Sequence, residues 1–196
     1  MRSVRILLVT AAVLTAASLL LPIWGVRMTA PQYPDEALML RIDRNGIGGD
    51  VQEVETLQRY IGVRFPEQMP ELEWLPAVVL ALAVLMLASA AAGRGRAARV
   101  LRVITVTLFV AFLAGSAALV QKRLYDVGHD RDPNAPIKAV KTFTPPIIGP
   151  AKVGNFTVWS FPHAGALSLL TAALLAGAAL RLAPARSGQA ARKRIA

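Results

Sequence analysis

Four long apolar stretches alternate with polar segments along the chain. Each holds about 20 residues, which is the length an α-helix needs to cross a hydrocarbon core of roughly 30 Å. Their interiors carry no Asp, Glu, Lys, Arg, Asn or Gln. We therefore predict four transmembrane helices, at residues 4–24, 75–92, 100–121 and 163–184.

The first long polar segment, residues 25–74, predicts a small folded unit. Residues 26–30 and 38–43 alternate apolar with polar side chains, which is typical of the two strands of a β-hairpin. Residues 50–62 place apolar side chains at helical spacing after Asp50, a residue type that often precedes a first helical turn. The pattern predicts a hairpin followed by one amphipathic helix.

The second long polar segment, residues 122–162, is rich in proline and shows no helical period. We predict that it is mostly extended. A connection of about 40 residues is too long for a simple loop, and loops of that kind are usually functional or ordered by other parts of a structure.

Charged residues are divided sharply between these segments. All twelve acidic residues lie within residues 25–74 and 122–163. Cytoplasmic loops of membrane proteins are enriched in Lys and Arg, so we predict a cytoplasmic loop at 93–99, a basic cytoplasmic tail at 185–196 and two periplasmic segments. Both termini are then cytoplasmic, and the chain is a multi-pass protein of the bacterial inner membrane. The basic residues without a counter-charge are Arg2, Arg5, Arg94, Arg96, Arg99, Arg102, Arg181, Arg186, Arg192, Lys193 and Arg194.

The tryptophans agree with this orientation. Trp24, Trp74 and Trp159 all fall near the predicted periplasmic ends of helices, and Trp prefers the headgroup level of a bilayer. The first helix also resembles a secretory signal peptide, which begins with basic residues and an apolar run. No small-x-small cleavage site follows it, because Met28 stands where a small residue is needed and Pro31 would follow the cut. This favours an uncleaved anchor, with cleavage as the alternative.

Composition excludes several functions. With 55% hydrophobic residues and a mean hydropathy of +0.48, the chain is too apolar for an ordinary soluble domain. The net charge of +10 is typical of nucleic-acid binding, but the predicted periplasmic segments have a net charge of −1. The excess charge lies beside membrane helices, so we predict the lipid bilayer and no nucleic acid as a partner. The absence of cysteine excludes disulfides and thiolate metal sites.

Histidine and methionine are the remaining candidates for chemistry. His129 and His163 are the two histidines of the chain, and both lie in or next to the second polar segment, while Met28 lies in the first. His and Met suit copper in a chain without cysteine, so these three are candidate metal ligands and copper the candidate cofactor. The alternative is an ordinary hydrogen-bonded or solvated His and a core Met. We find no nucleophile with a base beside it, and predict that the protein is not an enzyme.

Four stretches of the polar segments carry a resemblance. They are LPIWGVRMTAPQYPDEALMLRI at 21–42, LQRYIGV at 57–63, YDVGHDRDPNAPIK at 125–138 and FTPPIIGPAKVGNFTVWSFPHAG at 143–165. In these stretches the chain resembles a family of four-span bacterial inner-membrane proteins that are often encoded beside nitrous oxide reductase and its copper-delivery and maturation factors. The resemblance implies an accessory protein that acts in the assembly or metallation of a periplasmic copper enzyme.

The chain departs from this family at two positions. The family has a histidine where Arg59 stands and tends to have another where Asn134 stands. If those histidines touch metal in relatives, that site is damaged here. The alternative function is a structural subunit of a larger membrane complex, which docks a membrane or periplasmic protein partner through the periplasmic segments. The candidate interface residues are Tyr33, Tyr60 and Trp159.

The predicted fold class is a membrane all-α protein. It consists of a four-helix transmembrane bundle, with both termini cytoplasmic, and a small α+β periplasmic cap made from both polar segments.

Overall fold

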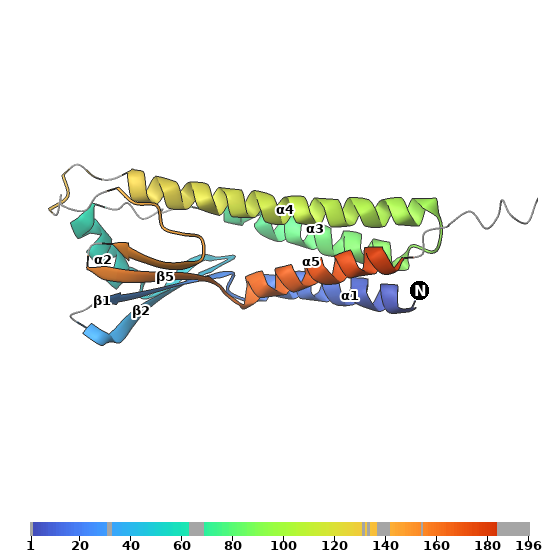
Figure 1. Cartoon of the computed structure of the whole chain (residues 1–196), viewed down its shortest axis with the longest axis horizontal. Coiled ribbons are helices and arrows are strands. Elements are labelled where there is room, and N and C mark those ends of the chain that lie inside the picture. Colours follow the sequence, from blue (N-terminus) through green and yellow to red (C-terminus); the bar gives the residue numbers. More distant parts are fainter. Residues whose placement is uncertain are drawn as a thin grey trace, which may run out of the picture.

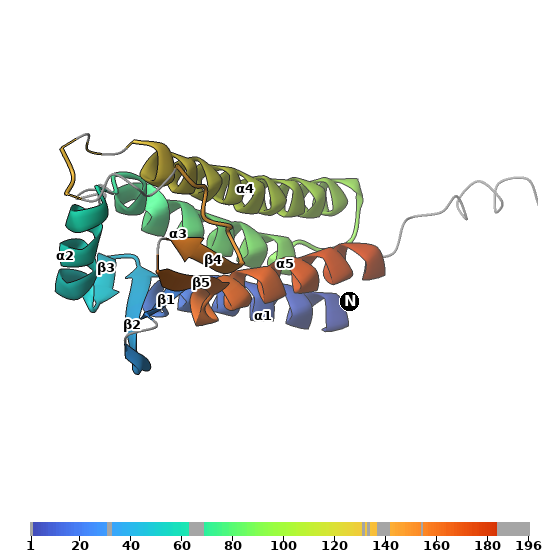
Figure 2. The same cartoon turned by 60° about the vertical axis from the view of Figure 1, so that its left-hand side comes forward.

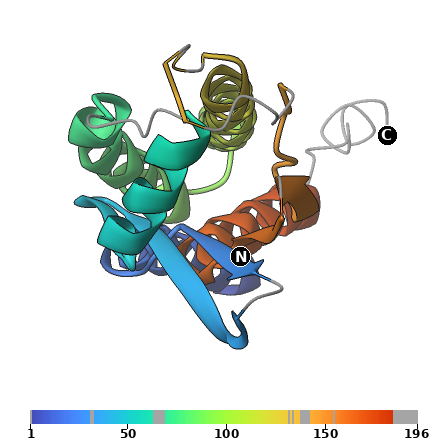
Figure 3. The same cartoon turned by 90° about the vertical axis from the view of Figure 1, so that its left-hand side faces the viewer.

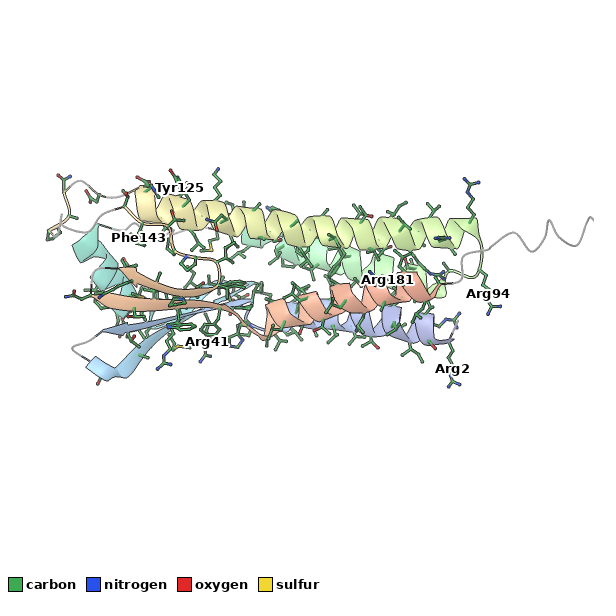
Figure 4. All side chains as sticks on the ribbon, viewed as in Figure 1. Arg2, Arg41, Arg94, Tyr125, Phe143 and Arg181 are labelled. Atoms are coloured by element: carbon green, nitrogen blue, oxygen red, sulfur yellow. The ribbon has the colours of Figure 1, made fainter. Side chains whose placement is uncertain are left out.

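Four long helices run side by side and lead, at one end, into a five-stranded antiparallel sheet (Figure 1). Each of the four helices is long and apolar enough to cross a membrane. We name the end of the helices that carries the sheet the sheet end. The opposite end is the basic end, where Arg2, Arg94 and Arg181 lie (Figure 4). The computed structural model describes residues 2–30, 33–62, 69–130, 132, 134–136, 142–153 and 155–183.

The four long helices differ from the predicted spans mainly at their sheet ends. The first helix, α1, is followed directly by a short 3₁₀ helix, η1. Helix α4, which corresponds to the span predicted at 100–121, continues as a regular helix beyond residue 121. Loss of hydropathy ends a membrane span but does not by itself end a helix. The bounds are α1 Arg2–Ala17, η1 Ser18–Leu20, α3 Glu71–Ala91, α4 Arg96–His129 and α5 Ala164–Leu182.

Small side chains lie where α1 meets its two neighbouring helices. Helix α1 packs between α3 and α5, and Ala11, Ala172 and Ala176 are almost fully buried where they meet. Small residues let helix backbones approach closely, which is how membrane helices gain packing energy. Helix α4 is the outermost of the four and lies against α3 and α5 (Figure 2). Phe109 is the largest side chain that α4 buries in this core.

Polar contacts join α4 to α3 near both of its ends. At the basic end, Ser89 Oγ and Thr105 Oγ1 lie 2.9 Å apart in the core, and the Arg102 side chain donates to carbonyl oxygens at the end of α3. At the sheet end, Arg123 donates two hydrogen bonds of 2.8 Å to the carboxylate of Glu71. This paired geometry is the strongest that Arg and a carboxylate make. Helix α4 is therefore held at two levels along α3.

The sheet contains both polar segments. Its order is β3-β2-β1-β5-β4, and every neighbouring pair is antiparallel. Strand β1 follows α1 and η1, and β5 precedes α5, so the central strand and its neighbour continue two neighbouring long helices (Figure 1). The bounds are β1 Trp24–Ala30, β2 Tyr33–Asp43, β3 Gly46–Gly49, β4 Gly149–Val153 and β5 Phe156–Pro162.

The predicted all-α fold class, with its small cap, is wrong: the chain is a mixed α/β protein in which the sheet is a substantial part of the fold. The segment predicted as extended, 122–162, begins with the last turns of α4 and supplies two of the five strands. Strand β5 pairs with β1 along its length, from Trp24 opposite Pro162 to Thr29 opposite Thr157. Such pairing depends on contacts between distant parts of the chain, so local propensity does not reveal it.

A single helix, α2 (Val51–Ile61), lies across one face of the sheet (Figure 3). The fully buried Val54 packs there with Met28 and Leu40. Asp50, just before the helix, exchanges two hydrogen bonds with the backbone of Met39 on β2, one of 2.8 Å through its carboxylate and one of 3.1 Å through its N–H. These bonds attach the start of α2 to the sheet.

Backbone hydrogen bonds join the bundle to the sheet. The N–H of His163 donates to Ile23 O at 3.0 Å, and that of Gly165 donates to Pro22 O at 2.8 Å. A Cβ on Gly165 would lie 2.9 to 3.1 Å from the carbonyl oxygens of Pro22, Leu21 and Ser18. The first turn of α5 can therefore approach the end of α1 this closely only with glycine at position 165.

We expect Gly165→Ala to destabilise the protein. Overpacking of this kind costs about 1–3 kcal/mol, partly offset by roughly 1 kcal/mol of helix propensity gained when Gly becomes Ala. Gly177→Ala is the matched control, because it lies on the same helix and a Cβ there meets no atom within 4 Å. Thermal unfolding in detergent should show a lower midpoint for Gly165→Ala than for Gly177→Ala. Equal midpoints would contradict the close contact.

The Glu71–Arg123 pair predicts a pH-dependent contribution to stability. Its hydrogen bonds with Arg123 hold the pKa of the Glu71 carboxyl below its ordinary value. A carboxyl with a lowered pKa stabilises the fold above its unfolded pKa, and this stabilisation is lost as the pH falls through the folded pKa. Because Arg123 is 40% exposed, solvent screens the pair and limits its contribution to about 1 kcal/mol.

We therefore expect Arg123→Gln to lower the thermal midpoint at pH 7 by roughly 2–4 °C. The difference from the unmodified protein should shrink when the pH is lowered until Glu71 is protonated. Lys122→Gln removes the same charge from the neighbouring exposed residue and should change the midpoint less at either pH. If the difference in midpoint between Arg123→Gln and the unmodified protein did not depend on pH, the Glu71–Arg123 pair would not be its cause.

Candidate functional site

The two faces of the sheet have different surroundings. One face carries Met28 and Leu40 and is covered by α2. Because side chains alternate along a strand, their neighbours Arg27 and Arg41 lie on the opposite face, which we name the open face. Figure 4 shows Arg41 on the side of the sheet that points away from α4.

An exposed tryptophan lies at the middle of the open face. Trp159 on β5 is 49% exposed. It stands opposite Arg27 on β1 and opposite Pro150 on β4, and Arg27 in turn stands opposite Met39 on β2. These four residues form one row across the sheet. Large apolar rings exposed in the centre of a surface are typical of contact sites for other molecules.

The charge of the open face is mostly positive. Arg27, Arg41 and Lys152 are all exposed on it. Of the side chains described on this face, Asp43 is the one carboxylate, and it accepts a hydrogen bond of 2.7 Å from the N–H of Asn45 in the adjoining turn. The face therefore combines three cations with an aromatic centre. Such a surface suits a ligand that has acidic groups around an apolar patch.

The row nearest the bundle is shaped by a glycine. Gly25 stands opposite Phe161 on β5 and Arg41 on β2. A Cβ at Gly25 would lie 2.6 Å from the Phe161 ring, so the ring lies over the backbone of β1. The ring of Phe161 is also 6.3 Å from the ring of His163. Aromatic side chains thus extend from the centre of the open face to the junction with the bundle.

The three candidate metal ligands occupy separate parts of the structure. Met28 is buried in the core between the sheet and α2, where its exposed fraction is 8%. His163 is the residue before α5, at the near end of the sheet, and its Nδ1 accepts a hydrogen bond of 2.9 Å from the N–H of Ala164. His129 ends α4 beside the far end of the sheet (Figure 1). The structure therefore does not bring them together.

The side chain of His129 contacts Tyr125, a residue of the same helix. Its ring stacks on Tyr125 with the ring centroids 3.9 Å apart, and its Nδ1 lies 2.9 Å from Tyr125 O. Within the part of the chain that the structure describes, no three His, Cys, Asp or Glu residues are grouped so that they could hold a metal ion. The described geometry thus provides His129 as a single exposed ring and not as part of a ligand set.

The two positions at which the resemblance implies histidine lie on segments that meet. Arg59 is in the last turn of α2, just before Gly62, and Gly62 O accepts a hydrogen bond of 2.9 Å from Asp132 N. The carboxylate of Asp132 accepts a bond of 2.8 Å from Asn134 N. His129 precedes this segment directly. The end of α2 and the segment that follows His129 are therefore joined by a hydrogen bond, and this chain has Arg59 and Asn134 at the two positions.

The structure describes the side chain of only one of the three candidate interface residues, Trp159. Trp159 is exposed on the open face of the sheet. Tyr33 lies on β2 and Tyr60 on α2, but their side chains fall outside the described residues. The sequence interpretation missed Arg27, Arg41 and Lys152 as members of a common surface. Their alternation with apolar residues was visible, but the pairing of β1 with β5 was not.

Comparison of the chain with protein-family models, curated proteins and solved structures gave no match.

The position of His163 predicts the effect of replacing it. An N-cap side chain accepts a hydrogen bond from a backbone N–H that has no partner inside the helix, and its loss costs about 1 kcal/mol. We expect His163→Ala to lower the thermal midpoint and His163→Ser, which restores a capping oxygen, to recover most of it. His129→Ala is the control at an exposed position. If His163→Ser were as unstable as His163→Ala, capping would not explain the role of this histidine.

Proposed function

We propose that this protein is a non-enzymatic accessory protein of the inner membrane that holds a partner protein against the open face of its sheet. The observation that carries the proposal is Trp159, half exposed at the centre of a face that bears Arg27, Arg41 and Lys152. Buried Trp and Arg contribute most of the binding energy at many protein interfaces. The preferred partner presents acidic groups around an apolar patch.

The distribution of charge supports an orientation for this surface. The arginines of the basic end, among them Arg2, Arg94 and Arg181, lie at the opposite end of the helices from the sheet (Figure 4). Since positively charged loops stay in the cytoplasm, both termini are cytoplasmic and the sheet is periplasmic. The open face then meets partners of the periplasm or of the outer side of the membrane.

The resemblance of the polar segments supports an identity for the partner. The family that these segments resemble is encoded beside a copper enzyme and the factors that deliver its metal, so the partner we expect is a component of such an assembly system. On this proposal the chain acts by docking and not by carrying copper. Two of its candidate ligands have structural positions, Met28 in the core and His163 at the start of α5.

Site-specific photo-crosslinking tests the docking proposal. Thr157 is exposed on the open face, and Thr56 is exposed on α2. A photoreactive residue at position 157, irradiated in intact cells, should give a discrete adduct that contains one other protein, whereas position 56 should not. The adduct should weaken when Trp159→Ala and Arg27→Gln are added, because the apolar and charged contacts are then lost.

The matched control is Trp74→Ala, which removes a tryptophan that is 56% exposed but lies on α3. It should leave the adduct unchanged. Irradiation of isolated membranes in about 0.5 M salt should give less adduct than irradiation of the same membranes at low salt, because exposed charges are screened at high ionic strength. Equal adducts at positions 157 and 56, or an adduct indifferent to Trp159→Ala, would contradict docking at the open face. A copper-delivery or maturation factor in the adduct supports the accessory role, and a stoichiometric respiratory subunit supports the structural one.

A further inference from the structure

A cavity lined by arginines opens at the basic end of the bundle. Its volume is about 220 Å³, and it is lined by Arg2 and Arg5 of α1, by Arg102 of α4, and by the apolar side chains of Val4 and Ala90. Three arginines thus line one small space. It lies at the opposite end of the helices from the open face and plays no part in the docking proposed above.

Two of these arginines are held in place by the end of α3. Arg102 is 4% exposed, and its guanidinium donates hydrogen bonds to the carbonyl oxygens of Ser89, Ala92 and Gly93 at 3.3, 2.9 and 3.1 Å. Arg5 Nε donates to Ala90 O at 3.3 Å. The last carbonyl groups of a helix have no partner within it and carry partial negative charge. They fix the guanidinium groups around the cavity without neutralising them.

The charge of the cavity has no acidic counterpart at this end. Every Asp and Glu of the chain lies within residues 25–74 and 122–163, and the described acidic side chains are all toward the sheet end. A buried guanidinium that lacks an anionic partner is costly unless a bound anion supplies one. The cavity is therefore complementary to an anion, and Arg is the residue that best matches the geometry of phosphate.

A second hollow continues from the first between α1 and α3. Its volume is about 380 Å³, and it shares Arg5 and Ala90 with the first. The rest of its lining is apolar and consists of Val9, Leu87 and Ala91. Val9 lies one helical turn from Arg5 toward the middle of the apolar span. The two hollows together have a cationic head and an apolar groove, which is the amphipathic shape of a membrane lipid.

We propose that this site binds an anionic phospholipid, with its phosphate between Arg2, Arg5 and Arg102 and an acyl chain along Val9 and Leu87. The apolar groove favours a lipid over a free phosphate ion, because an ion would leave the groove empty. The charge favours an anionic headgroup over a zwitterionic one, since basic residues near a membrane surface attract anionic lipid. The lipid would also bridge α1, α3 and α4 at the end where α4 is held by Arg102.

Native mass spectrometry of the full chain in detergent tests this proposal, with phosphatidylglycerol and phosphatidylcholine of the same acyl chains as probes. We expect one phosphatidylglycerol to remain bound under conditions that remove phosphatidylcholine. Arg2→Gln with Arg5→Gln should weaken phosphatidylglycerol binding by about tenfold or more. Arg94→Gln with Arg96→Gln removes two exposed arginines of the same end that do not line the cavity, and should change binding less than twofold. Equal losses in the two double variants would mean general attraction to the basic end and would overturn the site.

Two further measurements distinguish a bound lipid from a bound free anion. Ala91→Phe fills the apolar groove and should reduce phosphatidylglycerol binding while leaving the arginines in place. Inorganic phosphate at millimolar concentration should not displace the lipid. Displacement by phosphate, together with normal binding by Ala91→Phe, would identify a free-anion site and overturn the lipid assignment. The circular dichroism of each variant should match that of the unmodified protein, and Arg102 is left intact because its loss would also remove the bonds that hold α3 to α4.

Discussion

The backbone hydrogen bonds between residues 22–23 and 163–165 are the contacts on which the rest of the structure depends. An apolar environment demands a partner for each backbone polar group, and a helix begins with N–H groups that have none inside it. At the start of α5, the Nδ1 of His163 and the carbonyl of Pro22 accept from the N–H groups of Ala164 and Gly165. The bond from His163 N to Ile23 O then leads directly into the pairing of β1 with β5.

This junction explains why the sheet and the bundle form one body. His163 alone separates β5 from α5, and η1 with residues 21–23 separates α1 from β1, so the position of the sheet follows from the packing of two of the long helices. The Glu71–Arg123 pair holds the sheet ends of α3 and α4 together. A force applied to the open face would therefore reach α1 and α5 through hydrogen-bonded backbone and not through a flexible loop.

Hydropathy located the four long helices because each depends on about 20 consecutive residues. Other features required contacts that a linear pattern does not contain. Trp24 Nε1 donates to Ser160 Oγ at 2.7 Å across 136 residues of chain, and the same long-range pairing places β5 beside β1. Of the candidate site, Trp159 was visible as an isolated aromatic residue, but the cations beside it became a surface only after β1 and β5 were joined. Met28 was proposed as a ligand because it is a soft donor, yet burial beside Val54 assigns it to the core.

The two edges of the sheet limit how the sheet can bind anything. Strand β3 has four residues, three of them glycine, and β4 has a proline and an exposed lysine within five residues. Short strands, proline and lysine at an edge all discourage a further strand from adding to a sheet. Addition of a strand through backbone hydrogen bonds is thus disfavoured at both edges, so recognition of any other molecule by the sheet would depend on the side chains of its faces. The same edges disfavour open-ended self-assembly of the chain through its strands.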